Sequence, residues 1–231
     1  MPDIDIKDLL KEPKDEKVFN SIGRASRHNI DKTGRIYHVI TKSNDGSVIF
    51  HQDSGNYRHS LLCKLCEEIG VTVIFSVTMP NHTHDVLLSP NWNLIPEVYK
   101  ILNMNLTKFI RKQNPKKYKE GVRILRRYPT YIVVRDIIAL FNLGKYVYDN
   151  PEYMRKENKY IPHDCFWMFE REYFPEAYDG TLYKKLFGLS PKELVEIYSN
   201  MTAGQVINYA KRRFANWTAA QTKAVFFREI G

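Results

Sequence analysis

The chain has 231 residues, a net charge of +9 and a hydrophobic content of 43%. This composition predicts a globular protein, and the lack of any run of about 18 apolar residues argues against a membrane protein. The charged N-terminus lacks the apolar stretch of a secretory signal, and three cysteines are too few for a disulfide framework, so we expect a cytoplasmic protein.

Hydrophobic periodicity divides residues 35–150 into seven predicted elements. After a polar extension over residues 1–20, a first strand begins at Arg35 and ends in the polar stretch 42–46. Asp53 and Ser54 are candidate N-caps of a helix that Gly70 closes. The remaining elements are strands over 71–79 and 82–88 joined by the turn Pro80-Asn81, a helix from Ile95 to Phe109, a strand over 130–134 and a helix over 136–150.

The order of these elements is strand, helix, strand, strand, helix, strand, helix. This order is typical of the α+β, ferredoxin-like split βαβ arrangement with one additional helix. We therefore predict an antiparallel sheet with helices packed on one face, in a domain that spans residues 21–155.

Residues 156–231 are predicted to form an aromatic linker and a small C-terminal helical region. Three capping boxes mark helix starts at Ser190, Thr202 and Thr218. The middle helix has a polar outer face that is compatible with a DNA-binding helix-turn-helix, although simple helix packing is the alternative. That face consists of Gln205, Asn208, Lys211 and Arg212.

Positive charge is concentrated in one stripe of the sequence. Between residues 100 and 135 there are eleven basic residues and one acid, so the rest of the chain is close to neutral. Tyrosines interleave with these residues, which favours contacts to phosphates and bases, whereas a solvated basic surface is the alternative. The expected DNA-binding residues, in an N-terminal arm and in the stripe, are Arg24, Arg27, Lys108, Arg111, Lys112, Lys116, Lys117, Arg123, Arg126 and Arg127.

Two pairs of side chains have the spacing of a catalytic site. His82 and His84 share one face of a strand about 6.6 Å apart, as two ligands of one metal ion do, although partly buried histidines also fit. Tyr146 and Asn150 are neighbours on one face of the last helix, where a surface aromatic is the alternative role for the tyrosine. An asparagine oxygen can complete a site of two imidazoles and one oxygen for a divalent ion.

Three motifs resemble those of the single-tyrosine HUH transposases, and among these the REP-associated tyrosine transposases most closely. The motifs are Gly34-Arg35-Ile36-Tyr37-His38-Val39, Met79-Pro80-Asn81-His82-Thr83-His84 and Tyr146-Val147-Tyr148-Asp149-Asn150-Pro151. The resemblance covers about residues 21–155, and the methionine-proline-asparagine-histidine block is its most specific part. The chain departs from the family at Thr83, where a hydrophobic residue is usual, and has a second phenol at Tyr148 on the other side of the helix.

The resemblance implies that His82, His84 and Asn150 hold a divalent metal ion, Mg²⁺ or Mn²⁺, and that Tyr146 is the nucleophile. The implied enzyme cleaves and rejoins single-stranded or hairpin DNA through a 5′-phosphotyrosine intermediate. Its partner is therefore DNA and not a membrane, and a homodimer is left open.

Two other functions are alternatives to this enzyme. A non-catalytic DNA-binding regulator would keep the same scaffold, and a metal-dependent hydrolase would use the histidine pair together with Asp85. The spacing disfavours the hydrolase, because the metallo-β-lactamase run places its acid two residues beyond the second histidine. Cys63 and Cys66 lie in one helix without a second pair, so packing is favoured over zinc, and His38 is expected to pack in the core or near the site.

Overall fold

A computed structural model gives the structure of the protein and describes residues 32–156, 166–167 and 180–227. The expected DNA-binding residues Arg24 and Arg27 lie outside these residues. The elements are β1 (Ile36–Lys42), α2 (Gln52–Ile69), β2 (Thr72–Met79), β3 (His82–Leu88), α3 (Leu94–Gln113), β4 (Thr130–Val134), α4 (Ile137–Lys156), β5 (Phe166–Trp167), α5 (Gly180–Phe187), α6 (Pro191–Asn200), α7 (Ala203–Arg213) and α8 (Ala219–Phe226).

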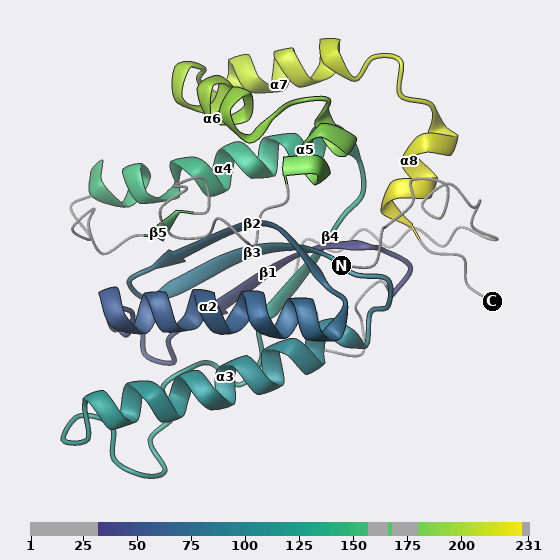
Figure 1. The fold of residues 1–231 in the computed structure, drawn as a ribbon. Helices are drawn as coiled ribbons and strands as arrows, with labels where there is room; N and C mark the ends of the chain where they lie inside the picture. Colours follow the sequence, from purple (N-terminus) through teal and green to yellow (C-terminus); the bar gives the residue numbers. More distant parts are fainter. Residues whose placement is uncertain (1–31, 157–165, 168–179, 228–231) are drawn as a thin grey trace.

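The strands form one antiparallel sheet in the order β4-β1-β3-β2-β5 (Figure 1). The first four strands and the two helices between them have the connections of the split βαβ motif. The predicted α+β, ferredoxin-like fold is therefore confirmed. The short β5, which pairs with the end of β2, was not predicted, because two residues are too few to show a periodic pattern.

Helices cover both faces of this sheet (Figure 1). α2 and α3 pack on one face against Tyr37, Val39 and Leu87. α4 packs on the other face, where Ile36 and Val86 are buried in a second cluster. The predicted one-sided arrangement thus holds for the two helices of the motif and not for α4. Side chains alternate along each strand, and both rows contain buried apolar residues, so each face needs a cover.

Two helix boundaries differ from the prediction. α2 begins earlier, with His51 as its N-cap, because the Ser54 hydroxyl accepts a hydrogen bond from the His51 backbone N–H at 2.8 Å and so acts inside the first turn. Gly70 ends this helix as predicted, in the left-handed conformation with φ 78°. α4 continues through Pro151 to Lys156, since a proline inside a helix removes one intrahelical hydrogen bond and leaves the neighbouring bonds in place.

The three predicted capping boxes are present at the starts of α6, α7 and α8. In each, a serine or threonine hydroxyl accepts from the backbone N–H three residues later, and the glutamate or glutamine there accepts from the cap N–H. The polar face of α7 is exposed, whereas Val206, Ala210 and Phe214 are buried. A role of that face in binding DNA stays a prediction.

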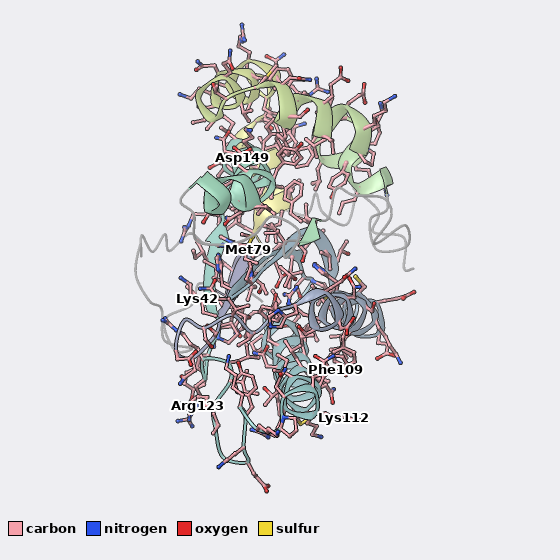
Figure 2. The ribbon with its side chains drawn as sticks, turned by 90° about the vertical axis from the view of Figure 1, so that its left-hand side faces the viewer. Lys42, Met79, Phe109, Lys112, Arg123 and Asp149 are labelled. Atoms are coloured by element: carbon pink, nitrogen blue, oxygen red, sulfur yellow. The ribbon has the colours of Figure 1, made fainter. Side chains whose placement is uncertain are left out.

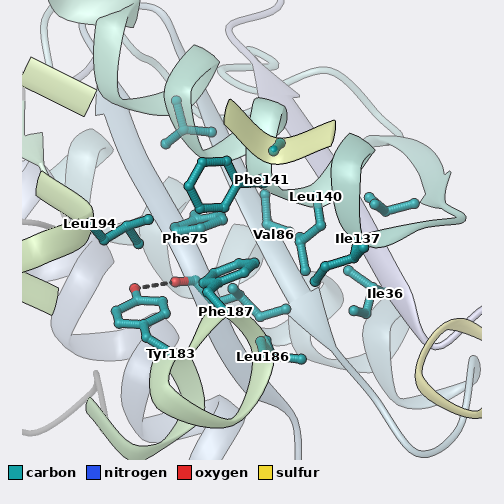
Figure 3. Close-up of a cluster of buried hydrophobic side chains, with 14 of the residues drawn as sticks. Ile36, Phe75, Val86, Ile137, Leu140, Phe141, Tyr183, Leu186, Phe187 and Leu194 are labelled. Atoms are coloured by element: carbon teal, nitrogen blue, oxygen red, sulfur yellow. Dashed lines mark hydrogen bonds between the residues drawn. The ribbon is translucent and has the colours of Figure 1, made fainter. Parts of the chain in front are cut away.

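The C-terminal helices share one hydrophobic cluster with the sheet and α4. Figure 3 shows Phe187 and Leu194 packed around Phe75 and Phe141 in this cluster. The hydroxyl of Tyr183 in α5 donates a hydrogen bond to the backbone carbonyl of Ile74 in β2 at 2.5 Å. Burial of large apolar side chains is the main stabilising term in such a core, so α5 to α7 hold α4 against the sheet.

Gly144 lies where α4 meets both β2 and α6, and it should not tolerate a side chain. A Cβ there would overlap the hydroxyl of Tyr198 and lie 2.7 and 2.8 Å from ring carbons of Phe75. We expect Gly144→Ala to lower the free energy of unfolding by about 1 to 3 kcal/mol, as overpacked cores do. The matched control is Gly204→Ala in α7, where a Cβ would meet nothing within 4 Å. Urea denaturation of both variants tests this, and equal stabilities would contradict it.

Candidate active site

The histidine pair lies at the start of β3, directly after the hairpin turn. β2 and β3 pair as far as Met79 and His82, so Pro80 and Asn81 form the turn as predicted. The His82 and His84 ring centroids are 4.9 Å apart, with the ring planes at 86°. The two imidazoles therefore lie together on the α4 face of the sheet, as the spacing predicted.

Hydrogen bonds hold one nitrogen of each ring. His82 Nδ1 lies 2.6 Å from Oδ1 of Asn81, which only accepts, so His82 carries its proton on Nδ1 and keeps a lone pair on Nε2. His84 Nδ1 lies 2.8 Å from Nε2 of His38. His84 Nε2 is buried and has no hydrogen-bond partner among the described residues. His38 and Asn81 therefore fix the orientation of the two rings, which the sequence did not predict, and such partners are typical of histidines that bind metals.

The three imidazoles are neutral at neutral pH. Burial lowers the pKa of His38 to about 4, against a smaller opposing effect of Asp85. Burial and then the charge of Lys42 lower the pKa of His82 to about 4. Burial, followed by the neighbouring histidines, holds the pKa of His84 well below its usual value. A neutral imidazole is the form that binds a metal ion, so the site needs no deprotonation step at pH 7.

Tyr146 projects from α4 over the histidines. Its ring centroid lies 5.3 Å from that of His84, with the planes at 88°, and 6.4 Å from that of His38. Tyr146 is 51% exposed, so solvent reaches this side chain. Tyr148 points elsewhere and lies against Tyr198 of α6, with centroids 6.1 Å apart. The structure thus brings Tyr146, and not Tyr148, to the histidine pair.

Asn150 lies one helical turn beyond Tyr146 on the same side of α4, about 6 Å further along the axis. It is buried, and its Nδ2 has no hydrogen-bond partner among the described residues. A buried N–H group without a partner is costly, and because Nδ2 is a donor, only the amide oxygen Oδ1 of Asn150 can serve as a cation ligand. His84 offers an unpartnered Nε2, and two imidazoles with one amide oxygen are side-chain types that bind divalent cations.

No group of three histidine, cysteine, aspartate or glutamate side chains within the described ranges is arranged to hold a metal ion. The predicted set differs from such a group because its third ligand is an asparagine. Cys66 is buried in the core and Cys63 is partly buried, as expected for packing. Burial raises the pKa of the Cys63 thiol to about 11, which disfavours the thiolate that zinc requires.

The basic stripe divides between the end of α3 and the loop that follows it. The loop is attached to the end of β1, since the backbone N–H of Arg126 donates to Lys42 at 2.9 Å and that of Asn44 donates to Ile124 at 2.8 Å. In the view of Figure 2, Asp149 lies above Lys42, and Arg123 and Lys112 lie below it. The basic loop therefore lies at the end of β1, where Lys42 pairs with His82.

Most of the expected DNA-binding residues in the stripe are exposed. Arg111 is the exception, because it is half-buried and its guanidinium donates to the carbonyl of Val122 at 3.0 Å, which ties the loop to α3. Arg127 lies over the ring of Tyr128, 5.1 Å from its centroid. The exposed members are Lys108, Lys112, Lys116, Lys117, Arg123, Arg126 and Arg127.

Comparison with solved structures finds similar folds. This chain is similar to a tyrosine transposase. That structure is a REP-associated tyrosine transposase bound to a REP hairpin, with a TM-score of 0.48 and 16% identity over 68% of this chain and 92% of that chain. A candidate transposase from Deinococcus radiodurans R1 gives a TM-score of 0.38 and 15% identity over 60% of this chain and 98% of that chain. No protein-family model and no curated protein matches the sequence.

None of the helices in the described ranges is both long enough and apolar enough to cross a membrane.

Proposed function

We propose that the protein is a metal-dependent transposase or endonuclease that cleaves and rejoins single-stranded DNA through a 5′-phosphotyrosine intermediate. The observation that carries this proposal is the position of Tyr146, whose ring centroid lies 5.3 Å from that of His84 and whose side chain is exposed to solvent. The motif resemblance supports the same chemistry independently of the geometry. One phenol beside two neutral imidazoles is compatible with a transesterification in which a single tyrosine attacks a DNA phosphodiester.

In the proposed step, Oη of Tyr146 attacks a DNA phosphorus. The bond between that phosphorus and the 3′ oxygen breaks, and the phenolic proton is transferred in net terms to the departing 3′-hydroxyl. The number of phosphoester bonds is conserved, so the released hydroxyl, or one on another strand, can reverse the step without ATP. A phenol is a weak nucleophile at neutral pH, and the phosphodiester must therefore be polarised.

His82, His84 and Asn150 would hold the divalent ion, with Nε2 of each imidazole and Oδ1 of the amide as ligands. When bound, such an ion draws charge from the non-bridging phosphate oxygens and orients the scissile group. Asn81 and His38 keep the two imidazoles in position through their hydrogen bonds at 2.6 and 2.8 Å. Burial of His84 and Asn150 limits the access of water to these ligands.

The hydrolase alternative needs an acid beside the histidine pair. Asp85 cannot supply it, because Asp85 lies on the opposite face of the sheet. Its carboxylate is buried there and accepts hydrogen bonds from Arg58, Ser76 and Tyr99. The structure therefore favours transesterification by Tyr146 over hydrolysis at an aspartate-containing centre.

Formation of a covalent adduct tests the proposal. Labelled single-stranded oligonucleotides incubated with Mn²⁺ or Mg²⁺ should yield a denaturation-resistant protein–DNA band, and a chelator should abolish it. His82→Ala should reduce the rate of adduct formation by at least about a hundredfold, because one ligand is lost. The matched control is His51→Ala, which changes an exposed histidine at the start of α2. Cleavage without an adduct would favour a hydrolase, and binding without cleavage would favour a regulator.

A further inference from the structure

The site face of the sheet continues beyond the histidines onto β1 and β4. Lys42 is the cross-strand partner of His82, and Ile132 is the cross-strand partner of His38. Directly paired residues on antiparallel strands project to the same face with Cβ atoms about 5 Å apart. Lys42 and Ile132 therefore lie on the α4 face, next to the site and outside the residues assigned to it.

Both side chains are open to solvent, because α4 packs over the other end of β1 and over β2 and β3. On β1, α4 covers the buried Ile36. The side chains on this face of β1 then become more exposed toward Lys42. Ile132 is 44% exposed, and Lys42 at the end of β1 is exposed as well. Ile40 and its partner Thr130, which lie between them, are half-buried.

Charge on this strip complements a phosphodiester chain. The ammonium of Lys42 is close enough to lower the pKa of both His82 and His84, although burial is the larger cause. The backbone N–H of Arg126 donates to the Lys42 carbonyl, so the basic loop begins beside the strip. Tyr128, which is 49% exposed, precedes β4 in the same loop. Proteins bind single-stranded nucleic acids with positively charged grooves and aromatic side chains, and Lys42 and Tyr128 supply one group of each kind here.

We propose that Lys42, Ile40, Thr130 and Ile132 form a binding strip for the single-stranded DNA that flanks the cleaved phosphodiester. Lys42 contacts a phosphate next to the scissile one, and Ile132 supports the sugar or base of a nucleotide further along. The strip extends about 13 Å between these two residues, so it holds more than one nucleotide. This inference rests on the proposed function, since it places the strand relative to Tyr146.

Oligothymidylate binding at several salt concentrations tests the cationic end of the strip. For single strands, each phosphate neutralised contributes about 0.7 to the slope of log affinity against log salt. Lys42→Gln should therefore lower the slope by about 0.7 and weaken binding about fivefold at about 0.1 M salt. Lys64→Gln is the matched control, because Lys64 is an exposed lysine on α2 at the opposite face. Equal slopes for the two variants would overturn the assignment of Lys42.

Introduced charges test the aliphatic end. Ile132→Asp should weaken binding of the same oligonucleotide and Ile132→Lys should strengthen it, because the new charge would lie beside the phosphodiester chain. Ser60→Asp and Ser60→Lys, at an exposed position of α2, are the controls and should change affinity little. An unchanged affinity for both Ile132 variants would overturn the strip.

The outcomes separate the strip from the chemistry. If the Lys42 and Ile132 variants change oligonucleotide affinity as expected, but the unmodified protein forms no adduct, the strip is supported and the proposed function is contradicted. If the unmodified protein forms the adduct, but substitutions at Lys42 and Ile132 leave oligonucleotide affinity unchanged, the proposed chemistry is supported and the strip is contradicted.

Discussion

Tyr146→Phe should abolish the covalent protein–DNA adduct and leave DNA binding unchanged. Phenylalanine keeps the ring that contacts His84 and removes only the oxygen that would bond to phosphorus. We expect the rate of adduct formation to fall at least about a thousandfold, as it does when a nucleophile is removed. The measurement is a denaturing gel with labelled single-stranded DNA and Mn²⁺, together with a separate binding titration.

Tyr148→Phe is the matched control for this experiment. Tyr148 is two residues away on the same helix, but its ring packs against Tyr198, so its hydroxyl is not directed at the histidine pair. This variant should form the adduct at the rate of the unmodified protein. An adduct that persists in Tyr146→Phe, or that is lost in Tyr148→Phe, would contradict the assignment of the nucleophile.

Replacing Arg58 should cause a large loss of stability. Arg58 forms a fully buried ion pair with Asp85 and also donates to the hydroxyl of Thr78 at 3.1 Å. Asp85 accepts further hydrogen bonds from Ser76 and Tyr99, each at 2.6 Å. Arg58→Met would leave a buried carboxylate without its counter-charge, and we expect the free energy of unfolding to fall by about 3 to 5 kcal/mol. Urea denaturation measures this change.

Two further variants identify the cause of that loss. Arg58→Met combined with Asp85→Leu removes both charges, so it should recover part of the stability, with the remainder lost because Ser76 and Tyr99 no longer donate to the Asp85 carboxylate. Glu68→Gln breaks the exposed ion pair with Lys64 and should have little effect, since solvent screens such pairs. A double variant less stable than Arg58→Met would show that the unpaired charge is not the cause.

The ion pair also fixes the strand that carries the histidine pair. Asp85 follows His84 directly in β3, so the strand that presents the histidines on one face is fixed by a buried network on the other. Arg58 in α2 and Tyr99 in α3 donate to the same carboxylate. The two helices of the split βαβ motif are thereby tied to the strand that carries the site.

The local elements of this fold were predictable from the sequence, because periodicity and caps act over a few residues. The strand over 130–134 and the three C-terminal capping boxes are where the sequence placed them. The order of the elements was sufficient for the split βαβ topology. Helix ends were less predictable, since Pro151 is a common stop signal, yet α4 continues beyond it.

The sequence by itself also determined that His82 and His84 share one face and that Tyr146 and Asn150 share another, since both pairs follow from the period of a strand and of a helix. Only the tertiary structure decided that these faces meet. It also decided that His38 supports His84 from 46 residues away and that Lys42 lies beside His82. Strand register and helix packing depend on the burial of distant apolar residues, and no local pattern in the chain encodes that choice.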